Sequence, residues 1–337
     1  MEITSHLLAI AGFFLLALLY NQWWVRIGSH KIKGMLAPEP SGALPIIGHL
    51  HKLRGQNPIA QTLGAMADKD GPIFMIRLGM KPALVISSHE AVKECFTTND
   101  KAFAARPMSS QGKHLGYNYA AFGFINYGKF WLKMRKITML ELLSSRRLET
   151  LKNVQVIEVD TLIKDLNTLC KCNEPNNQAK VVISEWVERL SFNIITRMIA
   201  GKRYFDSFSH GNDGEAQAAQ RIGKSIKAFM YAAGVPIISD LIPFLGCFDL
   251  LGQVKSMKRI ARELDSVAGS WVEEHSMRRL KGSEPTDKLD FIDVMLSEIE
   301  DDAFGHTRET IIKATALVSY CHLSHNLINQ PSFYFVL

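Results

Sequence analysis

The amino-terminal segment 3–25 contains no charged side chain, and this run constrains the chain more than any other feature of its sequence. A helix rises about 1.5 Å per residue, so such a segment reaches roughly 30 Å, the thickness of the hydrocarbon core of a bilayer. Tyr20, Trp23 and Trp24 lie towards the end of the run, where aromatic side chains favour the membrane interface. We therefore expect residues 1–28 to form a single transmembrane helix.

The charges around this segment predict its orientation. Arg26, Lys31 and Lys33 follow the apolar run, whereas Glu2 is the only charged side chain before it. Because basic residues stay on the cytosolic side, the bulk of the chain is expected in the cytosol. The alternative is a cleaved signal peptide, but its basic residues would precede the run and a small-residue cleavage site would follow it. The pattern favours an uncleaved signal anchor.

Residues 29–50 differ from the rest of the chain because they contain Pro38, Pro40 and Pro45 with interspersed glycines. Prolines at this density exclude a helix and predict a stiff, extended connector.

The rest of the 337-residue chain is long enough to bury a large core, and 47% hydrophobic residues exclude a disordered protein. The net charge of +6 gives no argument for nucleic acid, and five scattered cysteines do not indicate a disulfide framework.

The apolar spacing after the connector is mostly that of helices. A β-hairpin is expected early, from strands 73–78 and 83–87 joined by a turn at 79–82. Helical spacing of three to four residues predicts helices over 58–68, 131–143, 146–170, 184–200, 215–233, 250–281 and 289–299. The expected class is therefore mainly α with a small β-sheet near the front of the chain.

Several segments match one family in order. They are 44–50 (LPIIGHL), 103–107 (FAARP), 127–136 (YGKFWLKMRK), 200–205 (AGKRYF) and 290–296 (DFIDVML). With the apolar run and the hairpin, this set resembles the plant microsomal cytochromes P450, the haem-thiolate monooxygenases, from residue 1 to about 316. The resemblance implies the amino-terminal part of the P450 fold behind a membrane anchor in the endoplasmic reticulum.

The resemblance also implies an activity, which is hydroxylation of a small apolar plant specialised metabolite with O2. Haem would be the cofactor, and NADPH electrons would arrive through a partner flavin reductase. No nucleic acid partner is expected. In this reading residues 51–316 form an incomplete P450 domain, and residues 317–337 form a divergent tail.

Trp131 and Arg135 are the candidate cofactor-binding residues. They stand four positions apart, so a helix projects both side chains to one face. An indole N–H and a guanidinium on that face can donate hydrogen bonds to the same anion, and the planar guanidinium matches the two oxygens of a carboxylate. By resemblance that anion is a haem propionate. A Trp and an Arg at this spacing are also common as a packed ring beside a surface charge, and only the other matched segments favour the haem reading.

Two further surfaces follow from the resemblance. The segment 108–128 looks like the loop that overhangs the substrate, and its aromatic side chains suit a planar or apolar molecule. They equally suit packing within the loop. Those predicted for this substrate loop are Tyr117, Tyr119, Phe122 and Phe124. Lys129, Lys133 and Lys136 resemble the surface that docks the acidic reductase, although a basic run is also typical of a solvated face.

The resemblance weakens after Ala316. The family continues there into an acid-threonine motif for oxygen, a Glu-x-x-Arg helix and a Phe-x-x-Gly-x-Arg-x-Cys-x-Gly loop that supplies the axial thiolate. Residues 317–337 contain none of these motifs. Because the family's oxygen chemistry depends on that thiolate, we expect no catalytic residues in this chain and no haem-dependent turnover by it. Cys321, His322 and His325 are not expected to bind a metal, since no complementary ligand pair lies nearby in sequence.

Two alternatives stay open. One is a non-catalytic, membrane-bound protein that uses the lysines near 129–136 to occupy the reductase or to pair with an intact enzyme. The other is a truncated gene model of a full-length active enzyme, which the transcript across the codons for 314–320 would decide.

Overall fold

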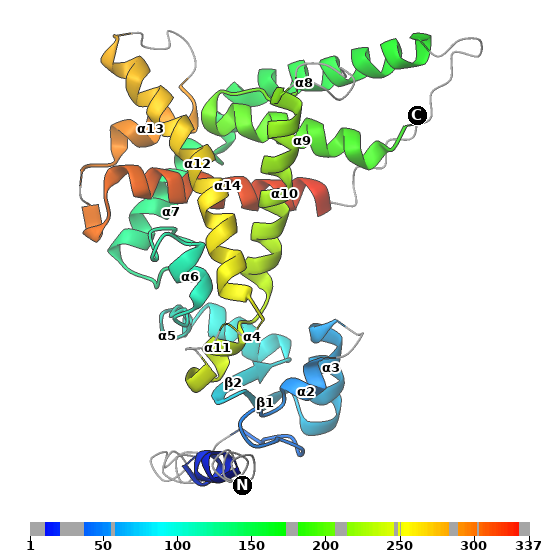
Figure 1. Cartoon of the computed structure of the whole chain (residues 1–337), viewed down its shortest axis with the longest axis vertical. Coiled ribbons are helices and arrows are strands. Elements are labelled where there is room, and N and C mark those ends of the chain that lie inside the picture. Colours follow the sequence, from blue (N-terminus) through cyan, green and yellow to red (C-terminus); the bar gives the residue numbers. More distant parts are fainter. Residues whose placement is uncertain are drawn as a thin grey trace, which may run out of the picture. The chain divides into compact units, whose positions relative to one another are not determined.

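The computed structural model describes residues 11–20, 37–54, 58–172, 181–205, 214–245, 249, 251–282, 289–301 and 303–329. Their contacts divide the chain into two compact units, residues 1–104 with 236–251, and residues 105–235 with 252–337. Helices dominate both units in Figure 1, with one small sheet. The expected class, mainly α with a small β-sheet, is confirmed.

The first unit contains the sheet and short helices. Its elements are α2 (Leu50–Leu53), α3 (Ile59–Asp70), β1 (Ile73–Leu78), β2 (Lys81–Ile86), α4 (His89–Phe96), α5 (Asp100–Phe103), α11 (Ile238–Leu241) and the 3-10 turn η1 (Pro243–Leu245).

Residues 11–20 are helical, and their apolar side chains are mostly exposed. Within the described residues, no helix combines the length and hydrophobicity needed to cross a bilayer. Most of the expected segment 1–28 lies outside those residues.

The strands β1 and β2 pair in antiparallel register, with Leu78 opposite Lys81. The turn is therefore Gly79 and Met80 alone, two residues shorter than the sequence pattern predicts. Gly79 has a φ of +63°, which suits a tight hairpin turn, and a Cβ there would lie 2.6 Å from the carbonyl oxygen of Leu241. Pro82 is part of β2, an edge strand of this two-stranded sheet, where a residue without a backbone N–H is tolerated.

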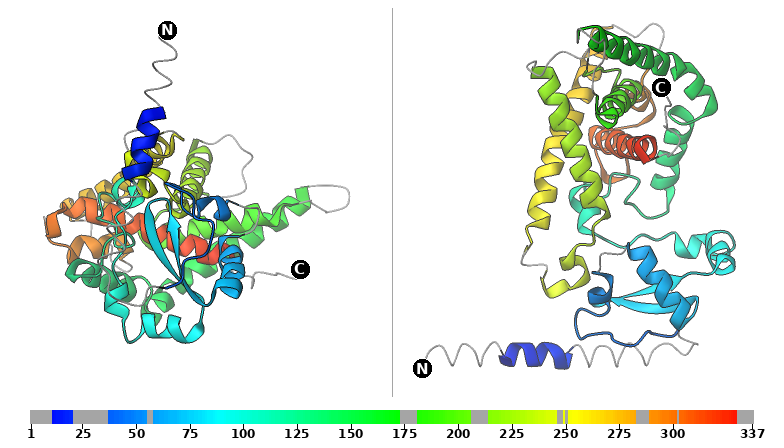
Figure 2. Two further views of the ribbon diagram at one scale, coloured as in Figure 1. Left: turned by 90° about the horizontal axis from the view of Figure 1, so that it is seen from below. Right: turned by 90° about the vertical axis from the view of Figure 1, so that its right-hand side faces the viewer.

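The second unit contains the long helices. They are α6 (Ser110–His114), α7 (Lys129–Glu141), α8 (Ser145–Cys172), α9 (Ile183–Ala200), α10 (Gly214–Gly234), α12 (Gln253–Leu280), α13 (Phe291–Glu298) and α14 (Arg308–Asn329), with the 3-10 turn η2 (Ala303–Gly305). The predicted helices match these within a few residues. Figure 2 shows α10 and α12 side by side, and α14 packs against α9, α12 and α13.

The core of this second unit lies around α14. Ile311, Ala314 and Ala316 are completely buried, and Tyr320 packs its ring on Phe192 of α9 at 5.8 Å between centroids. The helix continues to Asn329, so it runs through the beginning of the segment 317–337 that the sequence marks as divergent. The apolar face of α14 therefore continues past the last residue that resembles the family.

Candidate functional site

Helix α7 positions the candidate cofactor residues. Phe130, Met134 and Ile137 form its buried face and fix the helix in the core. Trp131 is half-buried beside this face, and Arg135 is exposed one turn later. The guanidinium carbon of Arg135 lies 4.9 Å from the centroid of the Trp131 ring, a cation–π contact. The structure thus brings together the two side chains that the sequence pairs.

This stacking leaves an exposed cation with a defined orientation. A guanidinium that lies over an indole keeps the N–H groups of its edge available, because the ring contacts its face. The Tyr127 ring packs at 5.4 Å from the Trp131 ring and further fixes it. The donor set fits a carboxylate such as a haem propionate, since a planar fork can bind both carboxylate oxygens.

The predicted reductase-facing lysines lie on the same helix. Lys129 and Lys136 are exposed and Lys133 is half-buried. At four- and three-residue spacing they share one side of α7, next to Arg135. The helix therefore has a basic exposed side and an apolar buried side.

The predicted substrate loop is held by its own backbone and by close packing. The Tyr119 hydroxyl donates to the carbonyl oxygen of Ser109 at 2.9 Å and accepts from its N–H at 3.1 Å. The Tyr119 ring fills the space over Gly112, where a Cβ would lie 2.3 Å from the ring. This tyrosine is therefore engaged within the loop.

Tyr117 and Phe124 pack against α14. Both rings cover a buried cluster of Ala120, Ala121 and Ala314, and Val318 joins them from the helix. Phe122 is half-buried in the same segment. Tyr117 and Phe124 are therefore the two predicted loop aromatics that pack beside α14.

The described cysteines differ in their environments. Cys95 in α4 and Cys170 in α8 are half-buried, whereas Cys321 in α14 is buried. Burial raises the pKa of the Cys321 thiol to about 12, so it stays protonated at neutral pH. Among the described residues no cysteine lies in the sequence context of an axial haem ligand. The side chains of Cys172, Cys247, His322 and His325 lie outside the described part.

A buried carboxylate is a feature that the sequence analysis missed. Glu158 of α8 has 2% side-chain exposure and pairs with Arg197 of α9 at 2.6 Å and with Arg203 at 3.1 Å. Asn193 also donates to it at 3.2 Å. The sequence does contain one indication that Glu158 is buried, because this residue continues the apolar stripe of Leu151 and Val154 along the helix.

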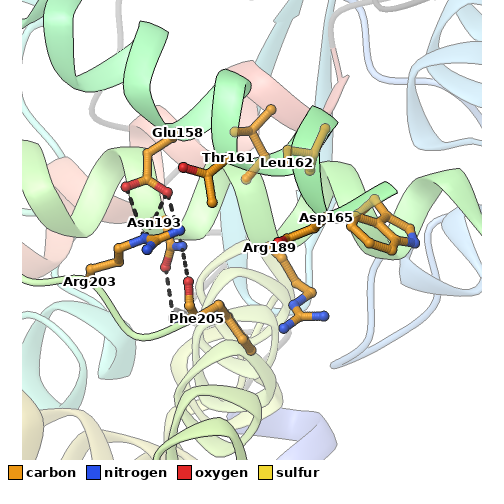
Figure 3. Close-up of a pocket in the computed structure, with 10 residues that line it drawn as sticks. Glu158, Thr161, Leu162, Asp165, Arg189, Asn193, Arg203 and Phe205 are labelled. Atoms are coloured by element: carbon orange, nitrogen blue, oxygen red, sulfur yellow. Dashed lines mark hydrogen bonds and ion pairs between the residues drawn. The ribbon is translucent and has the colours of Figure 1, made fainter. Parts of the chain in front are cut away.

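This network borders a cavity of about 30 Å³, enough for a water molecule. Figure 3 shows Glu158, Asn193 and Arg203 converging, with Arg189 and Asp165 also lining the cavity. The Arg189 guanidinium carbon lies 4.6 Å from the centroid of the Phe205 ring, and burial lowers the pKa of Arg189. Glu158 of α8 is paired with Arg197 of α9, so the network joins these two helices.

A second buried cluster joins α12 to α13. His275 Nε2 lies 2.6 Å from a carboxylate oxygen of Asp290, and its Nδ1 lies 2.6 Å from the carbonyl oxygen of Trp271. Asp290 also caps α13 by accepting from the N–H of Asp293 at 3.0 Å. Burial, followed by the negative charge of Asp290, raises the pKa of the Asp293 carboxyl. The ligand atoms of His275, Asp290 and Asp293 lie close enough together to hold a metal ion. The hydrogen bonds described above already use both ring nitrogens of His275 and the carboxylate of Asp290.

Comparison with known proteins identifies the family. The model of the Cytochrome P450 family matches residues 38–319. Cytochrome P450 CYP82J17 of Trigonella foenum-graecum is 54% identical over 88% of this chain and 56% of its own length. Vinorine hydroxylase of Rauvolfia serpentina is 47% identical over 88% of this chain and 62% of its own, and flavonoid-6-hydroxylase of Mentha piperita is 40% identical over 94% and 60%.

The fold agrees with this result. A zebra fish cytochrome P450 solved with progesterone superposes with a TM-score of 0.58 over 79% of this chain and 56% of its own, at 19% sequence identity. The chain spans about three-fifths of the length of the curated relatives named above. A family match over most of the chain and identities of 40–54% show that this protein belongs to the cytochrome P450 family, as the sequence resemblance predicts.

Proposed function

We propose that this protein is a member of the plant monooxygenases that hydroxylate small apolar specialised metabolites. The named relatives include hydroxylases of vinorine and of a flavonoid, which supports this substrate class. In the proposal, haem supplies the oxygen chemistry and electrons come from NADPH through a flavin reductase. Residues 1–28 anchor the protein in the endoplasmic reticulum membrane, and residues 29–50 connect this anchor to the P450 domain of residues 51–316. The bulk of the chain lies in the cytosol.

The contact between Trp131 and Arg135 carries the proposal. The exposed guanidinium of Arg135, stacked at 4.9 Å on the Trp131 ring, would hold a haem propionate. The loop that carries Tyr117, Tyr119, Phe122 and Phe124 would border the substrate. We further propose that residues 1–337 do not sustain oxygen chemistry, because they contain no axial-cysteine motif and Cys321 is kept protonated by burial.

The first test is a reduced, carbon-monoxide difference spectrum of membranes that contain residues 1–337. No thiolate-type Soret band is expected while blotting confirms the protein. A red-shifted band would show ligation by a cysteine and would contradict the proposed incompetence.

A second test examines the propionate site without turnover. Haem added to the purified chain should bind with weaker affinity in Arg135→Ala than in Arg135→Lys or the parent, by roughly tenfold for the loss of one charge-assisted contact. Lys164→Ala, an exposed charge on α8, is the control. Equal affinities in all variants would exclude Arg135 from the site.

The second candidate function is a non-catalytic protein that binds the reductase. The exposure of Lys129 and Lys136 on one side of α7 favours it. Reversing both charges to Glu should abolish binding to an acidic flavin reductase, whereas Lys164→Glu should retain it. Binding that survives the double reversal would exclude this face as the docking surface.

A further inference from the structure

The proline-rich connector is bound to the hairpin along its described part. From residue 37 onward it follows the edge of β1 that does not pair with β2. The N–H of Met75 donates to the carbonyl oxygen of Pro38 at 2.8 Å, and the N–H of His49 donates to the carbonyl oxygen of Arg77 at 2.7 Å. An uncovered strand edge would expose unpaired backbone groups. The connector therefore completes the backbone hydrogen bonding of this strand.

The ring of His49 adds two bonds between the same segments. This side chain is completely buried. Its Nδ1 lies 3.0 Å from the backbone nitrogen of Arg77, and its Nε2 lies 2.9 Å from the carbonyl oxygen of Pro40. A backbone N–H can only donate and a carbonyl oxygen can only accept. Nδ1 therefore accepts, Nε2 donates, and the ring is neutral with its single proton on Nε2.

Close packing and an ion pair fix the segments that His49 joins. Gly48 has a φ of +57°, and a Cβ added there would lie 2.4 Å from the carbonyl oxygen of Arg77. Only glycine allows the backbone to approach β1 so closely. The guanidinium of Arg77 binds the carboxylate of Glu39 at two points, 2.8 and 2.9 Å apart. The residues before Pro40 and before His49 are thus both held against β1.

A second proton on the His49 ring is incompatible with this arrangement. It would occupy Nδ1, so that its N–H would face the N–H of Arg77. The hydrogen bond between them would be lost, and a backbone donor and a ring charge would be buried without partners. Burial of such groups is costly, whereas release of the connector returns them to water.

The charged groups on the neighbouring segments do not offer a free counter-charge. Glu39 is the one acidic residue of the described connector, α2, β1 and β2, and Arg77 already binds it. Lys52 of α2 donates to the carbonyl oxygen of Ser41, the residue after the Pro40 that accepts from His49. Both nearby cations disfavour a further positive charge.

Two other titratable surroundings act differently. Nδ1 of His51 lies 3.2 Å from the carbonyl oxygen of Gly48 and can donate to it in either charge state of that ring. From α3, Lys69 and Asp70 line a groove together with Lys52, and their opposite charges offset each other. Neither contact requires a change when the pH falls.

We propose that His49 is a pH-sensitive link, which holds the connector on β1 while its ring is neutral and releases the connector when the ring takes up a second proton. An imidazole in an unfolded segment gains that proton near pH 6.5. Because the bound ring must stay neutral, the link contributes fully above about pH 6.5 and is lost as the pH falls further. The connector follows the membrane anchor in the proposed function, so the link also fixes where the anchor leaves the domain. This last consequence alone rests on the proposed function.

The test is amide hydrogen exchange of the 337-residue chain at pH 7.5, 6.5 and 5.5, corrected for the intrinsic pH dependence. Peptides that cover residues 38–50 and 73–80 should exchange faster by up to about tenfold for each pH unit below about 6.5. His49→Gln has a side-chain amide that does not titrate, so this pH step should disappear whatever its rate. His49→Asn keeps an acceptor for the Arg77 N–H and should also lack the step.

Two matched variants show whether the step belongs to His49. His51→Gln changes an exposed ring two residues away and should keep the step. Glu39→Gln removes the carboxylate bound to Arg77 and should keep it as well. A step that persists in both His49 variants, that vanishes in either control, or that is absent from the parent would overturn the proposal.

The protonation state of the ring is measured separately. Nitrogen-15 NMR of the histidine-labelled chain should show, for the signal that disappears in His49→Asn, a neutral ring with its proton on Nε2 at pH 7.5. A proton on Nδ1 at that pH, alone or with one on Nε2, would contradict the link.

None of these measurements uses haem, substrate or reductase. Failure of the carbon-monoxide or haem-binding test therefore leaves this inference standing, and failure here leaves the proposed function standing.

Discussion

At the scale of single residues, the structure separates charges that matter for stability from those that do not. Glu158 is buried with two arginine partners, whereas Glu188 pairs with Lys227 at 2.7 Å in an exposed position. A buried ion pair that loses one partner leaves an uncompensated charge away from water. An exposed pair is screened by solvent and contributes little.

Glu158→Gln should therefore lower the free energy of unfolding by about 3 kcal/mol, because Arg197 and Arg203 lose their counter-charge. Glu188→Gln should change it by less than about 1 kcal/mol. Urea denaturation of the purified chain in detergent, followed by tryptophan fluorescence, measures both. Equal effects of the two substitutions would show that burial of Glu158 does not determine its contribution.

The cysteines give a second test at this scale. Cys321 should react with iodoacetamide far more slowly than Cys95 or Cys170 at pH 8, because burial keeps its thiol protonated and shielded. Peptide mass spectrometry of the alkylated native chain measures the three rates. Comparable labelling of Cys321 would mean that α14 opens readily at this position.

At the scale of elements, helix ends and turns depend on a few close contacts. Helix α9 ends at Ala200 and is capped by Gly201, which has a φ of +62°. A Cβ added at Gly201 would lie 2.9 Å from a carboxylate oxygen of Asp290. The same carboxylate caps α13 and binds His275. Asp290 therefore joins the end of one helix to the start of another.

Asp290→Ala removes both the cap of α13 and the partner of His275, while Asp290→Asn retains the cap. Loss of the cap alone costs about 1 kcal/mol. Asp290→Ala should therefore destabilise more than Asp290→Asn by about that amount, seen as faster amide exchange in Phe291–Glu298. Identical exchange in the two variants would show that the cap does not stabilise the helix.

Gly79→Ala tests the hairpin turn. The new methyl group would meet the carbonyl oxygen of Leu241 at 2.6 Å, and the positive φ adds strain, so the variant should lose about 1–2 kcal/mol. Gly64→Ala in α3 is the matched control, because its Cβ meets nothing within 4 Å and Ala favours a helix. Amide exchange in β1 and β2 should rise only for Gly79→Ala.

At the scale of the whole molecule, buried titratable groups concentrate in one unit. Burial raises the pKa values of Tyr117, Tyr204, Tyr320 and Cys321, all in the unit of residues 105–235 and 252–337. Below about pH 8 these groups are protonated in both the folded and the unfolded chain, because an ordinary thiol titrates at about pH 8.5 and an ordinary phenol at about pH 10. At higher pH only the unfolded chain releases the protons, which favours unfolding.

The stability of this unit should therefore fall between about pH 8 and 12, by up to about 1.4 kcal/mol per pH unit for each group that titrates. Hydrogen exchange corrected for the intrinsic pH dependence reports the two units separately. The decline should be smaller in Cys321→Val, which removes one titrating group. A fall of equal size in residues 37–104 would contradict the assignment to these four groups.

The sequence by itself determined the helical class, the hairpin, the family and the pairing of Trp131 with Arg135, because these depend on spacing along one element. A helix places residues four apart on one face whatever surrounds it. The two-residue turn at Gly79 and Met80 was not predicted, because the sequence pattern places Pro82 in the turn, whereas the register of the hairpin makes it part of β2.

Only the tertiary structure decided which polar residues are buried together. Glu158 meets Arg197 and Arg203, and Asp265 meets Lys313, across elements that are distant in sequence. A sequence does not distinguish an exposed carboxylate from a buried one, because burial and ion-pair partners depend on how the helices pack. The partners of Glu158 and Asp265 therefore depend on the packing of the helices, and the pattern of residues along each helix carries no information about them.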